Sequence, residues 1–366
     1  MSFVTFKNDC VAISGGQKPS TEATYIYILL VVVSSWALVM GIFALVVLTR
    51  RRSIRMGSMR VNLMTLTIFE IILNISIFYC ILTRLTVSAD IAERLVVALV
   101  NIFSFCVLQG SLCTRNWIIT LIALARCVAI TRPMASRLMS THLFRPKPLG
   151  CLTVLCILTG YILGFSRLVE MEITICQNLD KRVRLTETTD PWKFPRYTYF
   201  IFQAALPIII LFISTVIMVT VLLRARVLTI DTRENNQGTK RIKCSPSQLR
   251  NSSGAQHTRM CAEKRVNYRR AQNQLRATRM ITLLAATFII FESPVFFCVV
   301  LEHHFERAHF RSVTWAVKSL VVLDSCANVF IYVLVSKRFR QESARLLNCF
   351  LKRSRRSRRS ASDIMY

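Results

Sequence analysis

Acidic residues are scarce in this chain. Its 366 residues include 19 Asp plus Glu against 48 Lys plus Arg, so the net charge is +29 although only 18% of the residues are charged. An average soluble protein has about 25% charged residues. The hydrophobic share of 53% excludes an intrinsically disordered chain, because such chains are poor in apolar residues. A soluble nucleic-acid-binding protein would carry its basic residues on a domain with an ordinary core, so this composition weighs against that class. The composition therefore predicts a membrane protein with basic loops.

Sequence patterns of catalytic and metal sites are also missing. No Cys/His cluster has metal-ligand spacing, and there is no Ser-His-Asp arrangement, Gly-rich phosphate loop or deaminase pattern. We therefore expect neither an enzyme nor a bound cofactor or metal. The two halves of the chain show no repeat, which an inverted-repeat transporter tends to have. The N-terminus lacks the continuous apolar core of a signal peptide.

Long apolar runs are the dominant feature of the chain. A helix of about 20 apolar residues crosses the hydrocarbon core of a bilayer, and only helices or closed barrels satisfy their backbone groups there. The sequence therefore predicts an all-α membrane protein, a seven-transmembrane helix bundle over residues 25–335. The seven spans are residues 25–49, 61–83, 95–125, 149–169, 197–223, 280–301 and 313–335.

Lys and Arg are distributed unequally between the two ends of these spans. The loops 50–60, 126–148 and 224–279 and the tail from 336 contain 34 of them, against 11 in the segments on the other side. Basic residues stay in the cytoplasm, so residues 1–24 are predicted to be extracellular and the C-terminus cytoplasmic, in the plasma membrane. The polar loop 224–279 is predicted to be a mobile third cytoplasmic loop.

The segment after the last span is predicted to lie on the membrane surface. Apolar residues recur through 336–351 opposite Arg and Lys, which is typical of an amphipathic eighth helix, with Cys349 as a palmitoylation candidate. The basic tail 352–366 fits anionic membrane lipid.

Motifs in the third and seventh helices resemble those of rhodopsin-like (class A) G-protein-coupled receptors. Trp117, Ala125-Arg126-Cys127 and Pro133 are similar to that family's Trp, acidic-Arg-Tyr triplet and inner-loop Pro, and Asn328-Val329 with Tyr332 is similar to Asn-Pro-x-x-Tyr. The end of the fourth helix, 165–170, is similar to the Pro-Arg-Phe-Phe-Glu of invertebrate FMRFamide-receptor-like neuropeptide receptors. The chain departs from the family at Ile42, Glu70, Ala125, Cys156 and Glu292.

This resemblance implies a receptor that transduces an extracellular ligand, a neuropeptide, to heterotrimeric G proteins. It assigns G-protein coupling and activation to Arg126, Asn328, Tyr332, Pro207, Phe288 and Pro294. Ala125 in place of the triplet's acid predicts raised basal activity. Alternative interpretations stay open, because Arg126 could serve only as a topology residue and Tyr332 only as an interfacial anchor.

Four ionisable or amide side chains within the spans are predicted to form a buried polar network: Glu70, Arg115, Asp324 and Asn328. Charges inside a membrane are costly and need partners or a wet cavity. In the receptor family a sodium ion lies beside the position of Glu70. We expect the Arg115 guanidinium to replace that ion by pairing with Glu70 and with Asp324. The alternative is a transporter or channel with Glu70, Arg115 and Asp324 on a translocation path.

The resemblance also places a ligand pocket at the outer side of the bundle. Glu292 and Lys318 would meet charged groups of a peptide, or each other. The pocket candidates are Leu108, Gln109, Tyr199, Glu292, Val295, Val299, Lys318 and Val322.

In this family a disulfide joins the second outer loop to the top of helix three. Asn101 occupies that helix position here, and Cys106 lies about 7.5 Å deeper along the axis. Cys176 could therefore pair with Cys106 or with Cys10.

Overall fold

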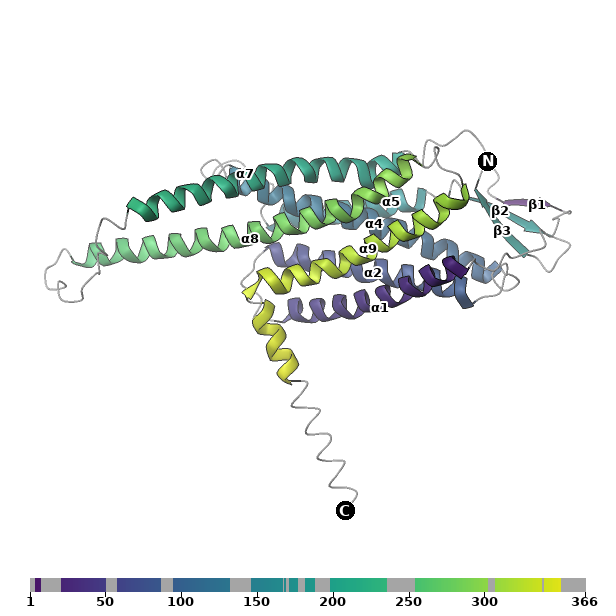
Figure 1. Cartoon of the computed structure of the whole chain (residues 1–366), viewed down its shortest axis with the longest axis horizontal. Helices are drawn as coiled ribbons and strands as arrows, with labels where there is room; N and C mark the ends of the chain where they lie inside the picture. The colour runs from purple at the N-terminus through teal and green to yellow at the C-terminus, as the bar shows by residue number, and fades with distance from the viewer. Residues whose placement is uncertain are drawn as a thin grey trace, which may run out of the picture.

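Seven long helices pack side by side along one axis in this computed structural model (Figure 1). They are α1 (Thr21–Thr49), α2 (Ser58–Thr86), α4 (Leu95–Thr131), α5 (Pro146–Ser166), α7 (Leu206–Asn235), α8 (Gly254–Leu301) and α9 (Arg307–Val335). The predicted seven-helix bundle is confirmed. The structure describes residues 4–7, 21–50, 58–86, 95–131, 146–166, 168, 171–176, 182–187, 198–235, 254–301, 307–337 and 339–349. Cys10 and the tail 352–366 lie outside the described residues.

The outer surface of the bundle has the composition expected for contact with lipid. Six helices are long and apolar enough to cross a membrane, and α9 makes a seventh when it is taken with the helix that follows it. Large apolar side chains are exposed along the bundle: on α5, Val154, Leu155, Leu158 and Ile162 are each more than half exposed. Apolar side chains in this position are stable only where the surroundings are apolar, as in a bilayer.

Three short strands form a small sheet that the all-α prediction missed. They are β1 (Val4–Lys7), β2 (Met171–Cys176) and β3 (Arg182–Glu187). β1 pairs parallel with β2 from Val4 opposite Ile173, and β2 pairs antiparallel with β3. Charged or polar residues alternate with apolar ones along β2 and β3, the period of a strand, which apolar runs alone do not reveal. The sheet lies beyond the bundle, at the end opposite the extensions of α7 and α8 (Figure 1).

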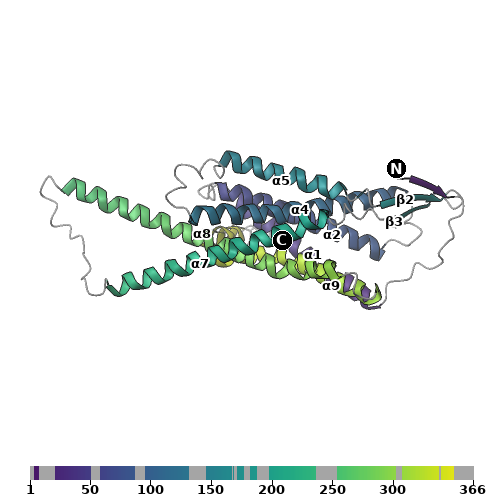
Figure 2. The same ribbon diagram turned by 90° about the horizontal axis from the view of Figure 1, so that it is seen from above.

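α7 and α8 continue beyond the apolar part of the bundle as a pair of extended helices (Figure 2). α7 ends at Asn235 and α8 begins at Gly254, so both helices enter the segment predicted as the loop 224–279. A helix in water does not need apolar residues all round, so a search for apolar runs ends these helices too early.

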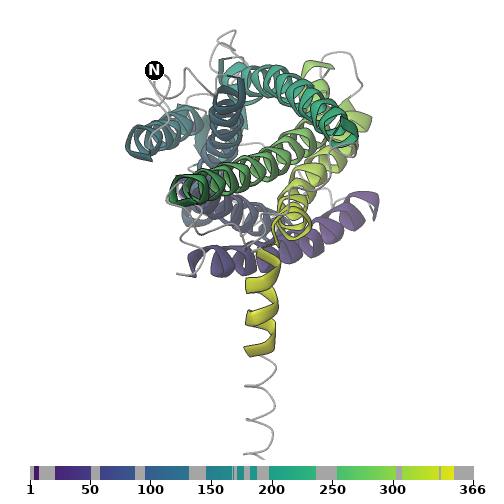
Figure 3. The same ribbon diagram turned by 90° about the vertical axis from the view of Figure 1, so that its left-hand side faces the viewer.

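The chain turns sharply after α9. The helix Phe339–Cys349 is bent by 100° from Ser319–Val335 and points away from the bundle axis (Figure 3). Arg340 Nη1 donates to the carbonyls of Val333 at 3.1 Å and Leu334 at 2.5 Å. These are carbonyls of the last turn of α9, which have no partner within their own helix.

α4 and α5 lie close together where both carry glycine. A Cβ on Gly164 would lie 2.6 Å from Gly110 N, and a Cβ on Gly160 would lie 2.3 Å from Thr114 Oγ1. Backbones of membrane helices come this close only where residues are small. The glycines therefore allow α5 to pack closely against α4 at Gly110 and Thr114.

Candidate functional site

Four charged side chains lie in the interior of the bundle. Glu70 of α2 and Glu292 of α8 are 2% exposed, and Arg115 of α4 and Asp324 of α9 are fully buried. Each comes from a different helix, so the four helices meet at this cluster. A charge inside a membrane protein needs a partner of opposite charge or hydrogen bonds, and the cluster supplies both.

Arg115 is the centre of this cluster. Its Nη2 donates a hydrogen bond to Glu292 Oε1 and lies 3.4 Å from Asp324 Oδ2. Its Nη1 donates to the backbone carbonyl of Val321, also at 3.4 Å. The guanidinium carbon lies 5.5 Å from the centre of the Phe288 ring, within the range of a cation–π interaction. One side chain of α4 thus holds α8 and α9 together.

Glu70 has a different partner from the one expected. Among the described residues Arg115 forms ion pairs with Glu292 and Asp324 and none with Glu70. Glu70 Oε1 accepts a hydrogen bond from Asn328 Nδ2 instead, and Asn74 Nδ2 donates to the Glu70 carbonyl at 2.8 Å. The expected pairing of Arg115 with Asp324 is present, whereas Glu292, which the sequence analysis assigned to the ligand pocket, takes the place expected for Glu70.

The cluster contains more carboxyl groups than basic groups. Glu70, Glu292 and Asp324 are three buried carboxyl groups beside one guanidinium. Neither carboxylate oxygen of Asp324 accepts a hydrogen bond within the part of the chain that the structure describes, although Oδ2 lies in ion-pair range of Arg115. In that same part of the chain no group of three or more His, Cys, Asp or Glu could hold a metal ion.

The two residues that follow Arg115 bind a backbone irregularity at the start of α7. Asn116 Nδ2 donates to the carbonyl of Gln203 at 2.8 Å, and Trp117 Nε1 donates to the carbonyl of Phe202 at 2.9 Å. Both carbonyls lie in η4 (Ile201–Ala205), a π-helical turn that leads into α7. Pro207 lies four residues after Gln203 and five residues after Phe202, and it has no N–H to donate to either carbonyl. Asn116 and Trp117 supply the donors that the proline lacks, and this explains why Pro207 is tolerated at this position.

The predicted pocket residues have different surroundings, and a shared site stays a prediction. Tyr199 Oη donates to Gln109, whose Oε1 is 2.7 Å away, and so joins the start of the α7 segment to α4. Val322 is fully buried in an apolar cluster with α1 and α2 residues. Leu108 and Val295 are half-buried, whereas Glu292 belongs to the ion cluster. The side chains of Val299 and Lys318 lie outside the described residues.

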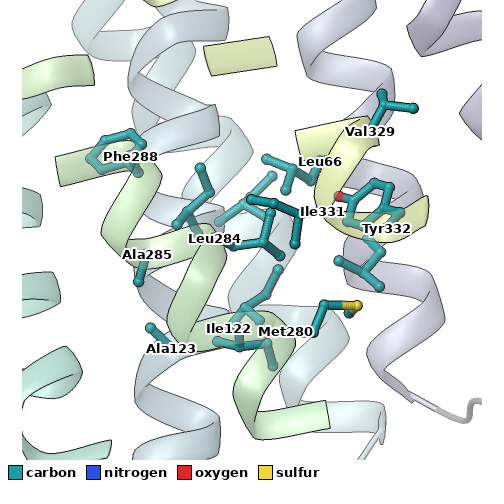
Figure 4. Close-up of a cluster of buried hydrophobic side chains, with 14 of the residues drawn as sticks. Leu66, Ile122, Ala123, Met280, Leu284, Ala285, Phe288, Val329, Ile331 and Tyr332 are labelled. Atoms are coloured by element: carbon teal, nitrogen blue, oxygen red, sulfur yellow. The ribbon is translucent and has the colours of Figure 1, made fainter. Parts of the chain in front are cut away.

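An apolar cluster fills the bundle beside Phe288, the ring that contacts Arg115. Figure 4 shows Leu284, Ala285 and Phe288 of α8 near Ile122 and Ala123 of α4. Leu66, Met280, Val329, Ile331 and Tyr332 belong to the same cluster. The Tyr332 ring lies 5.8 Å from the Phe339 ring in the helix after α9. Arg126 is half-buried one turn beyond Ile122, and Pro294 is half-buried within α8, two residues after Glu292.

Cys106 is a free, fully buried cysteine, so the predicted pairing with Cys176 does not form. The reason is its depth: Cys106 lies inside α4, whereas Cys176 lies in β2 of the outer sheet, where it is in register with Lys7. The alternative partner, Cys10, is outside the described residues. Cys349 is exposed at the end of the helix after α9.

Residues 255–350 match the model of a family described as Serpentine type 7TM GPCR chemoreceptor Srw. The matched region contains nearly all of α8, all of α9 and the helix that follows. A search of the curated proteins found no match. The family match supports a G-protein-coupled receptor, a multi-pass membrane protein, and gives no support to a transporter or channel. The similarity to FMRFamide-receptor-like neuropeptide receptors stays a prediction.

Proposed function

We propose that this chain is a plasma-membrane receptor that transmits the binding of an extracellular ligand to a heterotrimeric G protein. The observation that carries this proposal is the match of residues 255–350 to a serpentine receptor family. The seven-helix bundle and the cluster that joins α2, α4, α8 and α9 fit such a function, because a ligand must shift an equilibrium between two arrangements of these helices.

The orientation follows from charge. The excess of Lys and Arg, 34 against 11, lies at the end where α7 and α8 extend. This end is then cytoplasmic, and the sheet β1–β3 is extracellular. The ligand would reach the bundle from the side of the sheet, near Gln109 and Tyr199.

A peptide is the ligand class that we propose. The resemblance of the fourth-helix end to neuropeptide receptors supports it. The strand β3 also leaves one edge unpaired among the described residues, and an extended peptide binds such an edge through its backbone.

Arg126 is the residue that we propose to contact the G protein. It is half-buried in the last two turns of α4, at the end of the bundle proposed to be cytoplasmic. Guanidinium groups bind backbone carbonyls and carboxylates of a partner through several donors at once. Removing it should abolish coupling and leave the bundle folded.

A G-protein dissociation assay in cells tests this proposal, without ligand and then with pooled amidated peptides. Wild type should signal, and Arg126→Ala should lose at least nine tenths of the signal at equal surface expression. Arg307→Ala, at the opposite end of the bundle, is the matched control and should signal like wild type. A wild type that is silent under every condition, although present at the surface, would refute the receptor function. Equal signals from Arg126→Ala and wild type would refute the role of Arg126 alone.

A further inference from the structure

The guanidinium of Arg115 lies between two carboxylates that belong to different helices. One nitrogen, Nη2, donates to Glu292 of α8 and also lies 3.4 Å from Asp324 of α9. The two contacts are not equivalent, because Glu292 accepts a hydrogen bond whereas Asp324 accepts none in the described part of the chain. Glu292 is therefore the stronger partner in this arrangement, and Asp324 is a second acceptor held ready beside it.

The remaining donors of Arg115 point away from α8. Nη1 donates to Val321 on α9 and Nε donates to Asn116 on α4, both at 3.4 Å. Among the described residues, the hydrogen bond to Glu292 is the only polar contact of this guanidinium with α8, and the ring of Phe288 supports it. If α8 moved, the guanidinium would stay with α4 and α9.

α8 also carries a feature that favours bending near Glu292. Pro294 lies inside the helix, where its ring displaces the preceding turn and it gives no hydrogen bond to the carbonyl of Ile290. The helix extends far past the bundle on the other side of this point (Figure 2). A small change of angle at Pro294 would therefore become a large displacement at its other end.

We infer that Arg115 is a transferable ion-pair partner, bound to Glu292 when α8 is packed against α4 and to Asp324 when α8 moves away. Breaking a buried ion pair is costly when a charge is left alone. Transfer to Asp324 avoids that cost, because the guanidinium never lacks a carboxylate. The inference rests on the proposed receptor function, and it identifies Glu292 as the group that holds the resting state and Asp324 as the group that stabilises the signalling state.

This switch predicts opposite effects for two similar substitutions. Glu292→Gln removes the charge of the resting partner, so ligand-free signalling should rise about fivefold or more, the lower range of typical coupling factors. Asp324→Asn removes the charge of the second partner, so it should lower signalling. In the double variant Asp324→Asn should cancel the increase that Glu292→Gln causes. A purely structural role of the cluster would make both substitutions harmful and would give no cancellation.

The experiment measures ligand-free G-protein dissociation for the two single variants and the double variant at equal surface expression. Thr287→Val is the matched control on α8, because its hydroxyl, within the described part of the chain, donates only to carbonyls of its own helix, and it should signal like wild type. Glu292→Asp keeps the charge on a shorter side chain and should give an intermediate increase, which retains the test if Glu292→Gln does not reach the surface. Signalling that falls in Glu292→Gln, or stays high in the double variant, would overturn the inference.

Deuterium uptake by α8 in the purified receptor, in lipid nanodiscs, separates this inference from the proposed function. Glu292→Gln should raise the uptake of α8, and Asp324→Asn should reverse the rise, with no G protein present. This pattern without any G-protein response would support the switch and refute G-protein coupling. Unchanged uptake in Glu292→Gln, in a receptor that couples, would refute the switch alone.

Discussion

Gly164 offers the sharpest test of how α4 is positioned. In Gly164→Ala the new Cβ would lie 2.6 Å from Gly110 N, 2.7 Å from Gly110 Cα and 3.1 Å from the Cys106 carbonyl oxygen. All three are backbone atoms of α4, so no side chain can turn aside to make room. The two helices must separate, and the change should therefore destabilise the bundle.

The size of the effect follows from two opposing contributions. Overfilling a packed interface costs about 1–3 kcal/mol, and contacts with rigid backbone belong to the upper part of that range. Replacing Gly by Ala within a helix returns up to about 1 kcal/mol. We expect a net loss of about 1–2 kcal/mol. Gly150→Ala is the matched control on the same helix, because nothing lies within 4 Å of its Cβ, and it should gain up to about 1 kcal/mol.

A thiol-reactive dye provides the assay in detergent solution, because Cys106 and Cys113 are fully buried and react only on unfolding. With about 2–4 °C of midpoint per kcal/mol, the two variants should differ by roughly 2–12 °C, Gly164→Ala being lower. Gly160→Ala should be partly rescued by Thr114→Ala, which removes the Oγ1 atom 2.3 Å from the new Cβ. Equal midpoints for Gly164→Ala and Gly150→Ala would refute the close backbone contact.

Two further predictions concern the α4 side chains beside this contact. Arg115→Ser should lower the unfolding midpoint, since a buried carboxylate without its partner costs about 3–5 kcal/mol. Sodium chloride, compared with choline chloride, should raise the midpoint of this variant and leave that of wild type unchanged. Equal salt responses of the two proteins would refute the idea that the guanidinium takes the place of a cation. Asn116→Ala and Trp117→Phe each remove a donor to η4 and should each cost about 1 kcal/mol, more for the buried Asn116 than for the half-buried Trp117. A larger loss of thermal stability in Trp117→Phe than in Asn116→Ala would contradict the proposal that these side chains replace the donor that Pro207 lacks.

The bundle itself could be predicted from the sequence because the bilayer imposes a minimum length on every apolar helix. That constraint gives no information once a helix leaves the membrane, so apolar runs predict a loop where α7 and α8 extend. The sheet was missed for a related reason: its signal is a period of two over six residues in β2 and in β3, which disappears in a search for apolar runs.

The composition of the ion cluster was predictable but its pairing was not. A charge within a span marks an interior position, which led to the prediction of a buried network of Glu70, Arg115 and Asp324 with Asn328. Which carboxylate meets the guanidinium depends on how the helices are rotated and how far the Arg115 side chain reaches. Motif positions in one sequence do not contain that information, and they placed Glu292 in a ligand pocket instead of in an ion pair with Arg115.

The polar residues of α4 make sense once its place in the bundle is known. Among the candidate spans α4 has the largest buried share, 56%, against 22% for α5. Consecutive residues of a helix point about 100° apart, so the four residues from 114 to 117 face neighbours on different sides. Thr114 meets α5, Arg115 meets α8 and α9, and the next two residues bind η4. A polar side chain that would be expelled from a lipid-facing helix is retained here because each neighbour supplies its partner. A shift of α5 or η4 must therefore also move Arg115, the residue that joins α8 to α9.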